Sequence, residues 1–307
     1  MDTISPSAVD ANRGKVVSQA LDQLGELSTL PEITLKIIET VEDPQSTARD
    51  LHEIVTHDLA LSARILRIVN SAFYGLPGQI ASIDRAIVLL GLNAVKNIAI
   101  AASLSRVFRG GRISRKYSAR DLWTHSLAVG AASKMLIESM KMALPDEAFV
   151  AGLIHDLGLV VMLQCYPNKL QELMRRLDKL QEDASAAADT PRLASAFVQA
   201  EQDLFGATHE DFGAALARRW KFPRSFHYVT GCHHRPGQLA RENRLLTQVV
   251  HTADALCCEA GIGLILPIDD HGPCPDVLEG LALTDRQLDR VRENLQHQVD
   301  LALALFA

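Results

Sequence analysis

The chain has 307 residues, of which 48% are hydrophobic and 22% are charged. This length and apolar content allow one large domain or two modest ones with a substantial core. The 31 basic and 37 acidic residues give a net charge of −6, so no overall positive field attracts nucleic acid or an anionic membrane. We therefore expect neither direct DNA binding nor a membrane partner.

The start of the chain lacks the apolar core of a secretion signal, and no apolar run reaches the roughly 18 residues of a membrane span. We therefore expect a cytoplasmic protein. The five cysteines are an odd number without C-x-x-C spacing, which predicts reduced thiols.

The first part of the chain shows helical periodicity without strand-like alternation. Residues 1–15 are polar and aperiodic, which predicts a flexible tail, and residues 16–112 are predicted to form an N-terminal helical subdomain. A His-Asp dipeptide, His57–Asp58, falls at a predicted helix junction. Because Asp58 can cap the helix that follows, we interpret this dipeptide as structural.

Residues 106–120 form the one strongly basic stretch, which Gly110 and Gly111 interrupt. The two glycines predict a hinge between two helical halves. We favour a solvated linker here, since charge runs usually face water. The alternative is a strip that binds an anion or a partner protein.

Residues 113–264 are predicted to form a second helical subdomain that holds the candidate site. Its centre is GLIHDLG, residues 152–158, where His155 and Asp156 lie in the middle of a long apolar run that predicts a buried helix, and Gly158 allows a tight approach or a break there. Such a pair must be hydrogen-bonded, ion-paired or metal-bound, because unpaired buried polar groups are costly. Taken alone, the pair is best explained as a core histidine bonded to its neighbour.

Other helices of this subdomain add histidines and carboxylates that we expect to face inward. His125 lies on an apolar helical stripe one turn after Asp121, and Asp254 lies on another such stripe. Further histidines fall at predicted helix ends. Together, the candidate ligands are His125, His155, Asp156, His209, His233, His234, Asp254 and Asp121.

This ligand set suits a mononuclear or dinuclear transition-metal centre built from several helices. Imidazole ligands disfavour magnesium, so we expect iron or manganese, with zinc as a further candidate. Asp156 could bridge two ions, and such centres support hydrolysis. Residues 265–307 are predicted to form a C-terminal loop and a helix from Thr284, without identifiable chemistry.

The motifs taken together resemble one known bacterial family, the HDOD (HD-related output domain) proteins. The N-terminal half contributes LPEITLKIIETVEDPQST, HDLALSARILRIVNSAFYG and IASIDRAIVLLGLNAVKNIAI. The second half contributes DLWTHSLAVG, GLIHDLG, EQDLFGATHEDFGAALARRW, CHH and HTADAL, which are similar to the HD phosphohydrolase core. The resemblance covers about residues 24–262.

The resemblance implies an all-α fold in which an N-terminal helical half packs on an HD-like helical bundle. It implies a signalling role, with signalling proteins as partners. It also implies that the defining HD ligands are His125, His155, Asp156 and Asp254, and that His209 with His233 or His234 matches the added ligands of dinuclear relatives. Asp121 matches an acidic ligand of some relatives.

Two departures argue against cyclic-di-GMP phosphodiesterase activity. Those relatives read HD-x-G-K, whereas Leu159 stands here at the lysine position, and their GYP motif is absent from HHRPGQLAREN. A phosphate in a water-poor site needs a cation besides the metal. We therefore expect a regulatory output protein whose metal centre is structural or sensory. The alternative is a metal-dependent phosphohydrolase that acts on a nucleotide or cyclic nucleotide.

Overall fold

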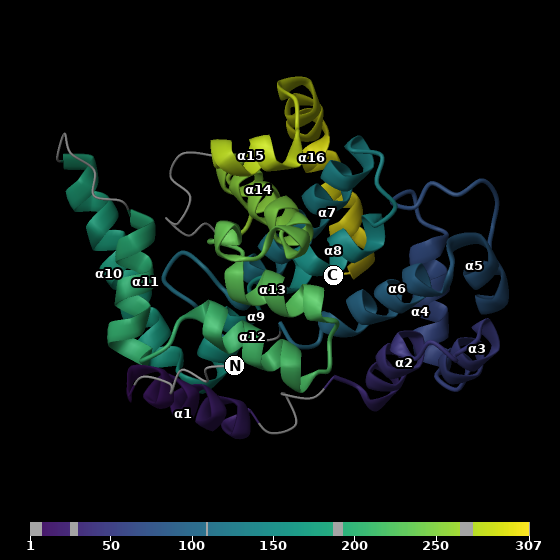
Figure 1. The fold of residues 1–307 in the computed structure, drawn as a ribbon, viewed down its shortest axis with the longest axis horizontal. Helices are drawn as coiled ribbons and strands as arrows, with labels where there is room; N and C mark the ends of the chain where they lie inside the picture. The colour runs from purple at the N-terminus through teal and green to yellow at the C-terminus, as the bar shows by residue number, and fades with distance from the viewer. Residues whose placement is uncertain (1–7, 25–29, 109, 187–192, 265–272, 307) are drawn as a thin grey trace.

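The computed structural model of the chain describes residues 8–24, 30–108, 110–186, 193–264 and 273–306. Every regular element within these ranges is a helix, which confirms the all-α prediction. The β pairing described there is one isolated bridge between Arg112 and Ser118. Figure 1 shows the helices of residues 32–104 beside a larger bundle formed by the later helices together with the first one.

The first half consists of five helices with caps that the local sequence specifies. The helices are α2 (Glu32–Glu42), α3 (Ala48–Thr56), α4 (Leu59–Val69), α5 (Ile83–Leu90) and α6 (Leu92–Leu104). Gly91, with φ of 88°, makes the sharp turn between α5 and α6. The Asp58 carboxylate caps α4 by accepting a hydrogen bond from Leu61 N at 2.9 Å, which confirms a structural role for this His-Asp dipeptide.

The predicted tail is wrong for residues 8–15, because helix α1 spans Ala8–Gln23. The helix begins earlier than the periodicity from Val16 indicated, and its later turns bury Val17, Ala20 and Leu21. This face packs on α9 and α12 of the second half, as Figure 1 shows for α12. Residues 1–7 of the predicted tail lie outside the described residues.

The helices of the second half pack around a shared apolar core. Its helices are α7 (Ala119–Ser139), α8 (Pro145–Ile154), α9 (Leu157–Cys165), α10 (Pro167–Ala186), α11 (Leu193–Phe205), α12 (His209–Arg219), α13 (Arg224–Cys232) and α14 (Leu245–Glu259). The short turns η2 (Pro236–Gln238) and η3 (Arg241–Asn243) connect α13 to α14. The predicted C-terminal part contains α15 (Pro275–Leu281) and α16 (Asp285–Phe306), and α16 packs on α7.

The connection between the halves is packed, whereas the sequence predicted a hinge. Ile113 in this connection is buried, Gln164 of α9 donates to Val107 O at 3.0 Å, and Lys116 pairs with Asp178 of α10 at 2.8 Å. The two halves also meet directly where α6 packs on α8. Binding of an anion or partner by residues 106–120 stays a prediction, and Arg109 lies outside the described residues.

The long apolar run is a buried helix with a break in it, and a tight approach occurs beside the break at Gly158; the sequence allowed both. Helix α8 ends at Ile154 and α9 begins at Leu157, so His155 and Asp156 form the junction. Gly158 allows α12 to approach this junction, because a Cβ at Gly158 would lie 1.8 Å from His209 O. By length and composition Pro145–Cys165 could span a membrane, but 89% of its most apolar window is buried in the fold, as in a core helix.

Candidate metal centre

The junction between α8 and α9 lies where α7, α12, α13 and α14 converge. Seven of the eight predicted ligands gather there, and six of these residues are buried with less than 5% exposure. They are His125, His155, Asp156, His209, His233 and Asp254, with His234 half-buried beside them. Small residues bring the helices together, since a Cβ on Gly152 would lie 2.6 Å from Val129 O of α7.

One group of donors forms between α7, the junction and α14. His125 Nε2 lies 3.0 Å from Asp254 Oδ1, and His155 Nε2 lies 3.3 Å from Asp156 Oδ2 and 4.0 Å from Asp254 Oδ1. One possible ligand atom from each of His125, His155 and Asp156 lies within 4.8 Å of the other two. We call these three residues together with Asp254 the HD group.

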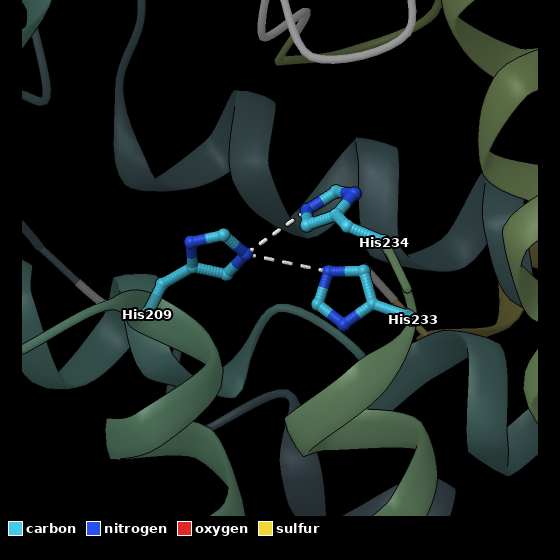
Figure 2. Close-up of side chains that lie close together, drawn as sticks. All are labelled: His209, His233 and His234. Carbon is cyan, nitrogen blue, oxygen red and sulfur yellow. Dashed lines mark hydrogen bonds between the residues drawn. The ribbon is translucent and has the colours of Figure 1, made fainter. Parts of the chain in front are cut away.

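A second group contains three histidines from α12 and the end of α13. Figure 2 shows the ring of His209 pointing toward His233 and His234. The Nε2 atom of His209 lies 3.3 Å from Nε2 of His233 and 3.0 Å from Nε2 of His234. We call these residues the histidine triad. Asp156 joins the two groups, because its Oδ1 lies 3.6 Å from His233 Nε2 and 3.9 Å from His209 Nε2.

Hydrogen bonds on the outer side fix four of these imidazoles. Nδ1 of His125 donates to Ile262 O at 3.3 Å, that of His155 to Gly152 O at 2.7 Å, and that of His233 to Val229 O at 3.1 Å. Nδ1 of His209 donates to the Glu201 carboxylate at 2.8 Å. Since an Nδ1–H faces each acceptor, Nε2 is the inward nitrogen that can bind a metal once it gives up any proton of its own, as in metal-binding histidines.

The inward atoms do not satisfy one another by hydrogen bonding. His209 Nε2 faces two other Nε2 atoms, and one proton cannot bond both. Within the described residues, His155 Nε2 and Asp156 Oδ1 are buried without a hydrogen-bond partner. Donors around one ion with bonds of about 2.1 Å lie roughly 3.0–3.4 Å apart, and trans donors about 4.2 Å apart. The distances of 3.0–4.0 Å within the HD group therefore fit a bound transition metal.

The carboxylates also set the protonation of the cluster. Burial opposes the charge of His155, but Asp156 and Asp254 outweigh it and raise the pKa of His155 to about 9. Burial is likewise overcome at His209, where Glu201 raises the pKa to about 9. Burial and the neighbouring His233 hold the pKa of His234 well below its usual value. Despite burial, hydrogen bonding and charge from His125 lower the pKa of Asp254 to about 2.

Asp121 is the predicted ligand that the structure does not bring into the cluster. Its Oδ2 accepts hydrogen bonds from Ser118 N and Ser118 Oγ, both at 2.7 Å, and closes a capping box at the start of α7. Asp121 O also accepts from Leu264 N at 3.0 Å. A carboxylate at the third helical position has this local alternative, which the spacing of four residues to His125 did not exclude.

Three residues near the cluster were not predicted from the sequence. Glu201 of α11 is fully buried and bonds both Nδ1 and the backbone N of His209, the latter at 3.1 Å. His251 Nδ1 donates to His233 O at 2.9 Å, and Cys258 Sγ lies 3.7 Å from Asp254 Oδ1. Glu201 had a detectable signal: it lies four residues after Phe197 and four before Phe205, on the apolar stripe of its helix.

Leu159 and Arg235 are two positions near the cluster that could carry a free cation, and neither does. Leu159, at the position where some relatives have lysine, is buried. Arg235 follows the paired histidines, but its guanidinium bonds the buried carboxylate of Glu210. That carboxylate also accepts from His234 N at 3.2 Å, so Arg235 and Glu210 hold the chain at the end of α13.

The fold and the cluster together define an all-helical protein of the HD-related class. The family model of the HDOD domain matches residues 27–236, and the chain belongs to this family. Asp254 and α14 lie beyond the matched residues, although Asp254 completes the HD group.

Solved structures share the fold. A Geobacter sulfurreducens HDOD domain protein of unknown function is 23% identical, with a TM-score of 0.71, over 96% of this chain and 99% of that chain. A proposed signal transduction protein of Marinobacter aquaeolei VT8 is 21% identical with a TM-score of 0.70, over 99% of this chain and 66% of that chain. A proposed phosphohydrolase of Shewanella amazonensis SB2B is 21% identical with a TM-score of 0.66, over 95% and 98%.

A curated relative is an uncharacterized protein of Treponema pallidum (strain Nichols). It is 25% identical over 241 residues, which are 78% of this chain and 44% of the relative. This chain thus spans less than half the length of that relative.

Proposed function

We propose that the chain is a regulatory output protein of the HDOD type whose second half holds one or two transition-metal ions. The observation that carries this proposal is the set of inward Nε2 atoms, whose rings are fixed by outer hydrogen bonds from Nδ1. Histidine ligation favours iron or manganese, or alternatively zinc, over magnesium.

The HD group would hold one ion, and the histidine triad with Asp156 would hold a second. A bound ion supplies Lewis acidity and concentrated positive charge at this junction. Gly152 O and Glu201 orient His155 and His209, so the chain itself sets the direction of their Nε2 atoms. Since the ligands come from separate helices, a bound ion would also stabilise their packing.

Burial and charge favour a structural or sensory role over catalysis. The six most buried ligands leave little surface for a substrate, and Leu159 adds no cation beside them. Arg235 is engaged by Glu210. We therefore propose that the state of the metal centre reaches signalling partners through protein contacts, in a cytoplasmic setting.

Elemental analysis of freshly purified protein tests this proposal. We expect stoichiometric iron, manganese or zinc in the wild type and its loss in His155→Ala and Asp156→Ala. The matched control is His57→Ala, in the other His-Asp dipeptide, which should retain the metal. Metal-free wild-type protein, or equal metal in all four proteins, would contradict the proposal.

A metal-dependent phosphohydrolase is the second candidate, because Asp156 lies between two donor groups as in two-metal hydrolases. The substrate of this enzyme would be a nucleotide or cyclic nucleotide. Phosphomonoesters and phosphodiesters should then be hydrolysed by protein loaded with iron, manganese or zinc, and Asp156→Ala should abolish turnover. No turnover by metal-loaded protein across the panel rejects this candidate and leaves the regulatory proposal intact.

A further inference from the structure

A groove between α1, α12 and α13 contains chemistry that the metal centre does not use. Its volume is about 740 Å³, within the range of roughly 300–1,000 Å³ that is usual for small-ligand sites. Its apolar lining includes Val17, Leu21 and Leu239, and α1 lies along α12 in Figure 1.

Helix α12 separates this groove from the metal centre. Glu210, Ala214 and Arg218 recur at steps of four residues and line the groove. His209 lies on the opposite face of α12, where its backbone approaches Gly158. The groove is therefore a second site, and its assignment does not depend on metal binding.

Two arginines give the groove an excess of positive charge. Its acidic residues are already engaged: Asp211 accepts from Thr208 N at 2.9 Å and pairs with Arg13 at 3.7 Å, and Glu210 pairs with Arg235. Arg218 and Arg224 also line the groove, and neither has a carboxylate within ion-pair distance in the described part of the chain. Guanidinium groups of this kind suit a phosphate.

The same wall offers a flat aromatic surface. The Arg224 guanidinium lies 5.5 Å from the ring centre of Tyr228, and both residues line the groove. His227 lies between them in the chain and also lines the groove. The ring of Tyr228 can receive the face of a nucleobase.

We propose that this groove binds a nucleotide, with its phosphate at Arg218 and Arg224 and its base on Tyr228. Calorimetric titration of the full chain with GMP and ADP tests the site, with guanosine, adenosine and inorganic pyrophosphate as partial ligands. We expect at least one nucleotide to bind more tightly than its nucleoside and than pyrophosphate.

Substitutions in the groove test whether the nucleotide binds there. Arg218→Ala and Arg224→Ala should each weaken the nucleotide about tenfold, since each removes a charge-assisted contact. Arg219→Ala is the matched control: Arg219 is adjacent on α12, exposed, and pairs with Asp22 outside the groove lining. Gly14→Phe should abolish binding, because a Cβ at Gly14 meets nothing within 4 Å and Gly14 lines the groove.

His155→Ala distinguishes nucleotide binding in the groove from metal binding in the cluster. Nucleotide affinity should be unchanged in this variant even when its metal is lost, so the groove and the metal centre can fail independently. The proposal is overturned if no nucleotide binds, if pyrophosphate binds as tightly as the nucleotides, or if the arginine variants and Gly14→Phe bind like the wild type. It is also overturned if binding disappears in His155→Ala.

Discussion

Replacement of Glu201 by glutamine probes how the fold prepares His209 for a metal. The carboxylate is fully buried and bonds His209 at Nδ1 and at the backbone N. Glutamine has nearly the same shape and can still accept through its oxygen, so Glu201→Gln removes mainly the charge.

The expected effect on metal-free protein follows from the pKa of His209. Against the effect of burial, Glu201 together with Asp156 and Glu210 raises this pKa from 6.5 to about 9. The net shift corresponds to about 3 kcal/mol of stability, which we take as the upper limit for the charge of Glu201. The stabilisation is complete below pH 6.5 and is lost as the pH rises through 9. Glu201→Gln should therefore lower the free energy of unfolding by up to about 3 kcal/mol at pH 6 and by much less at pH 9.5.

The metal-bound protein should respond through ligand orientation. Loss of an outer carboxylate partner weakens metal affinity by about 10–100-fold, or roughly 1.4–2.7 kcal/mol. Urea unfolding with chelator at pH 6 and 9.5, and metal titration at pH 7.5, measure both effects. Asp203→Asn is the control, because it removes a charge from an exposed position of the same helix. Unchanged metal affinity together with an unchanged pH dependence would refute this reasoning.

Three further changes test other parts of the site. Gly158→Ala should lower stability by about 3 kcal/mol or more and displace His209, because its Cβ would lie 1.8 Å from His209 O; a wild-type thermal melt would contradict the close approach. Asp121→Ala should cost about 1 kcal/mol of capping energy without loss of metal, and metal loss in elemental analysis would restore Asp121 as a ligand. Metal affinity should rise from pH 6 to 9, since the ion displaces protons from His155 and His209, whose pKa values are about 9; calorimetry that detects no proton release would contradict this.

Local chemistry explains the parts of the fold that the sequence predicted well. The caps at Asp58 and Thr208 act within three residues, so their hydrogen bonds follow from the adjacent sequence. The resemblance and the apolar stripes together indicated most of the cluster, because inward positions on different helices of one core must meet. Seven of the eight predicted ligands do so.

The sequence left open those features in which local and long-range interactions compete. Asp121 could cap α7 or face His125, and spacing alone does not decide between these roles. The sequence allowed a tight approach or a break at Gly158, but α12, which makes that approach, lies about fifty residues later in the chain. Glu201 lies on a stripe that sequence can reveal, but its partner His209 is known only once α11 and α12 are packed.

Anomalous diffraction at the metal absorption edge tests the central claim most directly. Crystals of metal-loaded protein should show a peak within about 2.1 Å of Nε2 of His155, between α7, α14 and the α8–α9 junction, and loading of the histidine triad should add a second peak beside Asp156. The account would be contradicted if metal-loaded crystals showed metal peaks only outside this cluster. It would also be contradicted if the peak persisted in His155→Ala and Asp156→Ala.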